Sequence, residues 1–345
     1  MKIALDATYS VGDYLSGVGI YSRELLRGLV SAHPDERFTF CYRPHRYLRS
    51  FAARLPANAS RSLLYEPLFP RSRDLFHGLN QRLPTIRFRR MVTTFHDLFV
   101  LTGDYSTPEF RRRFAEQARQ AAAESDAIIT VSEFTARQVE TLLGVERSRL
   151  HVVHHGTNRR APADRAPAAR QNLILNVGAI QHRKNIARLV EAFERTPPGW
   201  KLALAGSAGY GAAEILARIG NSRRRGDIEV LGYVPAEALG GWYARASVFA
   251  FPSLDEGFGM PVLEAMAAGV PVMASNRAAL PEVCGDAALL VDPEDVAGLA
   301  AALERLMRDQ ALREELMARG VDRASRFSWE KAAAQTWEVY QGLLI

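Results

Sequence analysis

The chain has 345 residues, of which 48% are hydrophobic and 24% are charged. These proportions are typical of a soluble globular protein and exclude a disordered or fibrous class. The length suits two domains of ordinary size. The formal net charge of +6 favours an anionic partner, but no aromatic RNA-binding strand, zinc spacing or helix-turn-helix pattern indicates nucleic acid.

The cysteines and the start of the chain indicate a compartment. Cys41 and Cys284 are far apart, and each lies in an apolar run, so we expect reduced core thiols and no catalytic cysteine. The chain begins directly with a strand-like run and has no signal segment. No window reaches the ~18 apolar residues of a membrane span. We therefore expect a cytoplasmic protein.

The first half of the chain alternates two patterns. Short apolar runs at 2–7, 37–42, 74–79, 91–100, 127–132 and 149–156 are separated by helical patterns, the clearest at 20–30, 110–126 and 133–144. Strands separated by helices of this length form a parallel sheet that is covered on both faces. Residues 1–158 are therefore predicted to form one Rossmann-like domain.

Residues 43–55 combine positive charge with apolar side chains at helical spacing. The residues concerned are Arg43, Arg46 and Arg49, beside Tyr47, Leu48, Phe51 and Leu55. One interpretation is a solvated helix face. The other is a helix that touches an anionic membrane surface, where each basic residue contributes roughly 1 kcal/mol.

A second alternation follows a segment of different composition. Residues 159–170 are rich in Ala, Pro and Arg without periodicity, which is typical of a linker. Apolar runs at 172–180, 201–209, 228–234 and 247–253 then alternate with helical patterns at 186–195, 212–221 and 236–246. Residues 171–328 are therefore predicted to form a second doubly wound domain.

Residues 254–269, LDEGFGMPVLEAMAAG, carry the most informative pattern. Glu256 and Glu264 lie eight positions apart across a glycine-rich turn. Gly257 and Gly259 allow positive φ and close backbone approach, and Pro261 favours the first turn of a helix. A helix starting near Pro261 would direct its free N–H groups at a phosphate, with Glu264 accepting from a ribose diol and Glu256 placed beside a hexose. The alternative is an acidic loop that caps an ordinary helix.

The stretch 241–276 around these glutamates resembles the E-x7-E region of retaining glycosyltransferases of family 4, also called glycosyl transferases group 1. The resemblance extends from SGVGIYSRELLRGL near the start to FSWEKAAAQTWEVY near the end. It implies the GT-B architecture, an α/β fold in which two Rossmann-like doubly wound parallel-sheet domains face a central cleft. In that architecture the first domain serves the acceptor and the second binds the nucleotide-sugar. The last helix, 329–345, would cross back to the first domain near 327–329.

Arg183 and Lys184 follow a predicted strand and precede a predicted helix. That position is the carboxyl edge of an open parallel sheet, where ligands bind. Two cations there can neutralise a diphosphate, and the resemblance implies a clamp on the pyrophosphate leaving group. The commoner spacing places the arginine several residues upstream, where this chain has Ala179 and Ile180, so Arg183 would take that role. The alternative is a basic helix terminus that pairs with surface acids.

Three histidines are considered for the site. His96, followed by Asp97, comes directly after a buried strand, and the resemblance implies that it faces the sugar or helps to hold the acceptor. The alternative is a packed histidine at a strand end. His154 and His155 would lie at the interdomain hinge with a structural role. No His, Cys or carboxylate group has metal-ligand spacing, so we expect no metal site.

The resemblance also implies further donor contacts. Gly17 and Gly19 would approach the diphosphate or the sugar, but the spacing around them lacks the third glycine and the later acid of a nicotinamide-binding fingerprint. Strand ends would line the phosphate path and meet the nucleobase, and the turn before Pro261 would select the donor. These residues are Gly206 and Ser207, Tyr233 and Val234, and Gly257, Phe258, Gly259 and Met260.

Together these features predict a retaining, metal-independent hexosyltransferase without a cofactor. His96, Glu256, Lys184 and Arg183 would carry the reaction, with a nucleoside diphosphate sugar as co-substrate and a glycan or glycolipid hydroxyl as acceptor. The motifs look most like those of bacterial mannosyltransferases that use GDP-mannose. The alternatives are a sugar-nucleotide epimerase or phosphorylase of the same architecture, and a non-catalytic sugar-nucleotide-binding protein.

Overall fold

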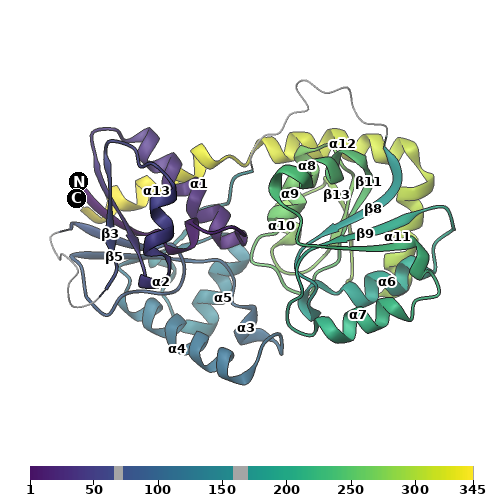
Figure 1. The fold of residues 1–345 in the computed structure, drawn as a ribbon, viewed down its shortest axis with the longest axis horizontal. Helices are drawn as coiled ribbons and strands as arrows, with labels where there is room; N and C mark the ends of the chain where they lie inside the picture. Colours follow the sequence, from purple (N-terminus) through teal and green to yellow (C-terminus); the bar gives the residue numbers. More distant parts are fainter. Residues whose placement is uncertain (66–72, 158–169, 345) are drawn as a thin grey trace. The chain divides into compact units, whose positions relative to one another are not determined.

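The computed structural model describes residues 1–65, 73–157 and 170–344 (Figure 1). The chain forms two compact units: unit 1 comprises Met1–Thr102, Thr107–Gly156 and Phe327–Ile345, and unit 2 comprises Gly103–Ser106 and Thr157–Arg326. Of the predicted linker 159–170, all residues except Arg170 lie outside the described part of the chain. Each unit is described by itself.

Unit 1 is built on a parallel sheet of seven strands in the order β3-β2-β1-β4-β5-β6-β7. The strands are β1 (Lys2–Asp6), β2 (Arg37–Tyr42), β3 (Ala59–Leu63), β4 (Leu75–Gly78), β5 (Arg90–Phe95), β6 (Ala127–Thr130) and β7 (Leu150–Val152). The α-helices are α1 (Gly17–Ala32), α2 (Pro44–Tyr47), α3 (Phe99–Thr102), α4 (Pro108–Glu124), α5 (Glu133–Leu143) and α13 (Trp329–Leu344).

Local sequence fixes the ends of the unit 1 helices. Ser16 caps α1 by accepting from the Gly19 backbone, and Thr107 and Ser132 cap α4 and α5 in the same way. The helices α1 and α13 pack closely at Gly28, where an added Cβ would come within 2.8 Å of the Ala333 Cβ. The C-terminal helix is thus part of unit 1.

Unit 2 is built on a parallel sheet of six strands in the order β10-β9-β8-β11-β12-β13. The strands are β8 (Gln171–Val177), β9 (Lys201–Ala205), β10 (Ile228–Gly232), β11 (Ala246–Phe251), β12 (Val272–Ser275) and β13 (Ala288–Val291). The α-helices are α6 (Ile186–Glu194), α7 (Ala212–Gly220), α8 (Ala236–Arg245), α9 (Met260–Ala267), α10 (Leu280–Cys284), α11 (Val296–Arg308) and α12 (Gln310–Ser325). Both predicted parallel α/β sheets are therefore confirmed.

Two local features differ from their sequence patterns. The helical pattern at 43–55 forms only α2 and a following 3-10 helix, η2 (Leu48–Ala52). The chain leaves helical geometry at Ala53, which has φ −109° and ψ 135°. Gly257 is not among the described glycines with positive φ, whereas Gly259 has φ 101°. A single left-handed residue is sufficient to start α9.

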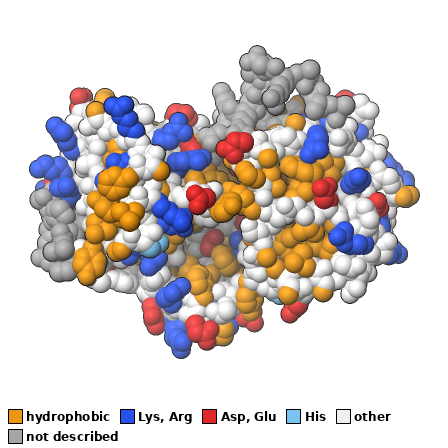
Figure 2. Space-filling model, viewed as in Figure 1, with side chains coloured by type: hydrophobic (Ala, Val, Ile, Leu, Met, Phe, Trp, Pro, Cys, Tyr) orange, Lys and Arg blue, Asp and Glu red, His pale blue; other side chains and the backbone are white. Residues whose placement is uncertain are grey.

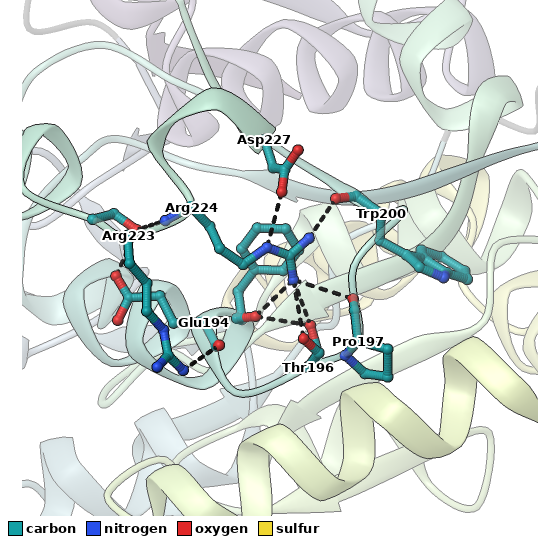
Figure 3. Close-up of polar contacts among 9 residues, drawn as sticks. Glu194, Thr196, Pro197, Trp200, Arg223, Arg224 and Asp227 are labelled. Atoms are coloured by element: carbon teal, nitrogen blue, oxygen red, sulfur yellow. Dashed lines mark hydrogen bonds and ion pairs between the residues drawn. The ribbon is translucent and has the colours of Figure 1, made fainter.

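The arginine cluster 223–225 is engaged within unit 2 and is not a free basic patch (Figure 3). The Arg224 guanidinium lies 3.9 Å from the centroid of the Phe193 ring and donates to carbonyl oxygens that follow α6, including the Trp200 oxygen at 2.8 Å. Arg223 donates to the Glu194 carbonyl. Arg223 and Arg224 therefore satisfy carbonyl groups at the C-terminus of α6, and Arg225 donates to the Ile228 carbonyl at the start of β10.

The remaining predictions about the core agree with the structure. Cys41 and Cys284 are both free and fully buried, and burial raises the pKa of Cys284 to about 12. Over the described residues, no helix is long and apolar enough to cross a membrane.

Candidate active site

The loop after β8 carries the predicted cation pair. Arg183 and Lys184 form the short 3-10 helix η4 (His182–Lys184), which is followed by Asn185 in a left-handed conformation with φ 58° and then by α6. The Asn185 amide donates to the carbonyl oxygens of Pro252 and Pro293 at 3.0 and 2.7 Å. Asn185 therefore ties this loop to the end of β11, a role that sequence reasoning missed.

Glu256 lies between the two cations. Its Oε2 is 3.0 Å from Nη1 of Arg183, and its Oε1 accepts a hydrogen bond from Nζ of Lys184. All three side chains are buried, with residue exposures of 6 to 8%. Burial by itself would raise the pKa of Glu256, but the charges of Arg183 and Lys184 outweigh it and hold the pKa at about 2. The carboxyl group is therefore ionised at every physiological pH.

Backbone at the strand ends approaches this ion cluster closely. Gly178 follows β8, and a Cβ built there would lie 3.3 Å from the Lys184 side chain. A Cβ at Gly206, after β9, would lie 1.9 Å from the Gly178 carbonyl oxygen. Only glycine fits at Gly206, because a larger residue would clash with the Gly178 backbone. Packing alone therefore requires glycine at this position, which the sequence analysis assigned to the phosphate path.

The second carboxylate of the motif is on α9, as the sequence predicts. The helix starts at Met260 with Pro261 in its first turn. Glu264 is partly exposed and accepts a hydrogen bond from the Tyr243 hydroxyl at 2.9 Å. Burial, and then the charge of Glu264, raises the pKa of Tyr243 well above its usual value, so the hydroxyl stays a donor. Sequence reasoning missed Tyr243, although it lies in the WYARA segment before β11.

The other residues of unit 2 that were predicted to bind the nucleotide-sugar donor lie directly after the ends of strands. Ser207 comes after β9, and Tyr233 and Val234 come after β10 at the edge of the sheet. Tyr233 is 39% exposed. In parallel strands these ends lie at one edge, so these residues share the edge that carries the Glu256 ion cluster.

His96 of unit 1 is partly buried and packs against the buried rings of Tyr21 and His155. Its ring lies edge-on to Tyr21, with centroids 4.7 Å apart, and is stacked on His155 at 5.4 Å. Its Nε2 is 2.9 Å from the Leu79 carbonyl oxygen. Burial lowers the pKa of His96 to about 4, although the Leu79 carbonyl opposes this. The neutral ring therefore donates from Nε2 and keeps Nδ1 as a hydrogen-bond acceptor.

A polar chain continues from this group through unit 1. The Tyr21 hydroxyl is 2.9 Å from the Thr94 hydroxyl, which is 2.8 Å from Nε2 of His77. Nδ1 of His77 is 2.5 Å from the Tyr340 hydroxyl on α13. These contacts link the surroundings of His96 to the C-terminal helix through neighbouring strands. No sequence pattern predicted them.

Gly17 and Gly19 lie in the first turn of α1. A Cβ at Gly19 would come within 2.8 Å of the Tyr9 carbonyl oxygen, so local packing is sufficient to explain why this residue is a glycine. His155 is buried and His154 packs beside Phe327 at 5.5 Å between ring centroids. Among the described residues, no group of three or more His, Cys, Asp or Glu could hold a metal ion.

Comparison with known proteins decides the family. The chain matches the family described as "Glycosyl transferases group 1" over residues 158–323 and the family described as "Glycosyltransferase Family 4" over residues 15–160. The O-antigen chain mannosyltransferase B of Escherichia coli is 34% identical over 384 aligned positions, covering 99% of this chain and 100% of that protein. The chain belongs to the group 1 glycosyltransferases. It is therefore a glycosyltransferase, and an epimerase or phosphorylase is not supported.

Other similarities agree with this assignment. The MMP alpha-(1->4)-mannosyltransferase of Mycolicibacterium hassiacum is 32% identical over 66% of this chain and 57% of its own. Sucrose-phosphate synthase from Thermosynechococcus elongatus superposes with a TM-score of 0.78 at 22% identity, covering 99% of both chains. Anabaena HepE in complex with UDP and glucose gives 0.76 at 16%, covering 99% of this chain and 100% of that one. At these identities the structures show the fold alone, which is GT-B.

The ion cluster makes a prediction about stability. Glu256→Gln should lower the free energy of unfolding by about 3–5 kcal/mol, because it leaves two buried cations without their carboxylate. Glu264→Gln is the matched control, and we expect a loss of about 1 kcal/mol or less, since Glu264 is partly exposed and its amide still accepts from Tyr243. Urea unfolding measures both values.

The pH dependence of the same variant gives a second readout. The Glu256 pKa is lower in the folded protein than in the unfolded chain, so its stabilisation is present above about pH 4.5 and is lost as the pH falls toward 2. The gap between the parent and Glu256→Gln should therefore narrow from pH 6 to pH 3. An unchanged gap would contradict a charge-based role for this carboxylate.

Proposed function

We propose that this glycosyltransferase transfers mannose, with retention of anomeric configuration, from GDP-mannose to a hydroxyl of a glycan or a lipid-linked glycan. The observation that carries the proposal is the buried cluster of Arg183, Lys184 and Glu256 at the carboxyl edge of the unit 2 sheet. The choice of mannose is supported by the relative aligned over its whole length, an O-antigen chain mannosyltransferase.

The two cations suit the leaving group. Transfer breaks the bond between the anomeric carbon and the terminal phosphate oxygen, and negative charge then develops on the diphosphate. Lys184 and Arg183 carry two positive charges against the single charge of Glu256, so the cluster retains a net attraction for an anion. Fixed charges in a site with little water stabilise this developing charge effectively. We therefore propose that transfer needs no metal ion.

The state of the carboxylates bears on how the acceptor proton leaves. Glu256 has a pKa of about 2 and is bound by two cations, so it is a poor proton acceptor at neutral pH. Glu264 is engaged with Tyr243. We therefore favour attack on the same face of the sugar, with the departing phosphate oxygen taking the acceptor proton. The new bond then keeps the original configuration.

Roles follow for the remaining residues. Glu264 would accept hydrogen bonds from the ribose diol, with Tyr243 holding its second oxygen. The free N–H groups at the start of α9 would face a phosphate. His96, neutral with Nδ1 as an acceptor, would receive a hydrogen bond from a sugar hydroxyl. For a lipid-linked acceptor, we also propose peripheral contact with an anionic membrane.

A screen of donors tests the function. GDP-mannose should raise the unfolding temperature more than UDP-glucose or UDP-N-acetylglucosamine, because a ligand at 100 times its Kd stabilises by about 2.7 kcal/mol. A larger shift of the unfolding temperature with a UDP-sugar would overturn the choice of donor.

Glu264→Ala should weaken GDP binding by roughly 1.5–3 kcal/mol through loss of the ribose hydrogen bonds. Calorimetry measures the affinity of this variant and of the parent for GDP. Equal affinities would contradict the proposed contact of Glu264 with the ribose.

Lys184→Ala should lower kcat by about 100-fold or more at saturating donor, because a stabiliser of the leaving group acts mainly in the transition state. Transfer of labelled mannose to a glycan acceptor measures this. Lys201→Ala changes an exposed lysine at the start of β9, away from the carboxyl edge of the sheet, and is the matched control that should keep most of the activity. Full activity of Lys184→Ala would contradict the pyrophosphate role. Loss of parent activity in EDTA, restored by Mg²⁺, would contradict the metal-free proposal.

His96→Ala should reduce transfer while leaving GDP affinity unchanged, because His96 belongs to unit 1 and its proposed partner is the sugar. His96→Asn, whose amide oxygen can still accept a hydrogen bond, should retain more activity than His96→Ala. The GDP affinity measured by calorimetry should therefore stay the same while the initial rate of transfer falls. If both quantities fall together, or neither changes, His96 is a packed histidine at a strand end.

A further inference from the structure

One segment of the chain accounts for its formal net positive charge. Residues 37–65 contain six arginines and no Asp, Glu or Lys. The rest of the chain contains 38 basic and 38 acidic residues. The whole formal net charge of +6 is therefore carried by this stretch of unit 1.

The segment forms one side of unit 1. It runs from β2 through α2 and η2 to β3, the edge strand of the sheet. We call the following residues the α2–η2 surface: Arg46, Tyr47, Leu48, Arg49, Phe51, Arg54 and Arg61. On the left of Figure 2, hydrophobic and basic side chains gather over the part of unit 1 where Figure 1 draws α2 and β3.

Large apolar side chains on this surface are unusually exposed. Leu48 is 81% exposed and Phe51 is 57% exposed. The Phe51 ring is fixed from two sides, edge-on to Tyr47 at 5.4 Å and beneath the Arg61 guanidinium at 4.9 Å. Arg61 in turn donates to the Ser50 carbonyl at 3.1 Å. The aromatic ring is thus held in a defined position at the surface.

Some other arginines of unit 1 have partners within the protein. Arg87 donates to the Glu124 carbonyl and pairs with Asp126, and Arg43 pairs with the buried Asp6. Within the α2–η2 surface, Arg49 lies 3.7 Å from Asp13, but both side chains are more than half exposed, so this pair is weak. Arg54 is exposed. Arg49 and Arg54 therefore direct their positive charge to solvent.

We propose that the α2–η2 surface docks on an anionic lipid bilayer. Leu48 and Phe51 would enter the interfacial region while the arginines contact lipid phosphates, the arrangement found in interfacial anchors. Each basic residue near an anionic leaflet contributes roughly fivefold in affinity. The charge complementarity favours lipid, since the surface carries four arginines and residues 37–65 contain no acid, and the Asp13 carboxylate beside Arg49 offsets only one of these charges. The inference rests on the proposed function only in that a lipid-linked acceptor lies in such a membrane.

Vesicle sedimentation of the full chain tests this. The parent should bind vesicles of phosphatidylcholine with phosphatidylglycerol, should not bind phosphatidylcholine alone, and should dissociate at high salt. Arg49→Glu combined with Arg54→Glu should reduce binding by about twentyfold or more. Leu48→Ser combined with Phe51→Ser should also reduce it while leaving the salt dependence. All four positions are exposed, and circular dichroism checks the fold.

A charge-matched control separates this surface from overall charge. Arg112→Glu combined with Arg113→Glu changes exposed arginines on α4 and should leave vesicle binding nearly unchanged. Equal losses in both charge variants, no binding by the parent, or release of the parent from vesicles by a short RNA that it prefers would overturn the proposal. GDP binding is measured in parallel. Failure of vesicle binding with intact GDP binding refutes this inference alone, and the reverse refutes the proposed function alone.

Discussion

The buried ion cluster is the constraint on which the site of unit 2 depends. Two cations and one carboxylate are each no more than 8% exposed, and the single carboxylate pairs with both cations, which offsets the cost of burying these charges. Arg183 and Lys184 come from the loop after β8, and Glu256 comes from the loop after β11. The cluster therefore fixes two loops at the carboxyl edge of the sheet. Among these three residues one positive charge remains in excess.

The surroundings of the cluster are arranged to keep it in place. Asn185 spans from the cation loop to the backbone that follows β11, and Tyr243 holds one oxygen of Glu264 on α9. The close approach of Gly206 to Gly178 brings β9 into the same edge. Each of these contacts joins two different elements of unit 2. A side chain held by such contacts is already ordered before a ligand binds, so it loses little conformational freedom on binding.

Unit 1 is organised differently. Its buried polar chain runs from Tyr21 through Thr94 and His77 to Tyr340, so neutral hydrogen bonds take the place that ion pairs have in unit 2. Burial lowers the pKa of His77 to about 3 and that of His96 to about 4. Both rings are therefore neutral at physiological pH, so this chain of hydrogen bonds carries no formal charge.

The sequence by itself determined the two parallel α/β sheets, the helix start beside Pro261 and the candidate residues Arg183, Lys184, Glu256 and Glu264, because these depend on spacing within a few turns of chain. The tertiary structure alone decided which of these residues meet. Glu256 and Lys184 are 72 positions apart, and Tyr340 and His77 are 263 apart. Such pairs form because β8 lies beside β11, and because α13 joins unit 1. Strand order and long-range packing leave no periodic trace in a single sequence.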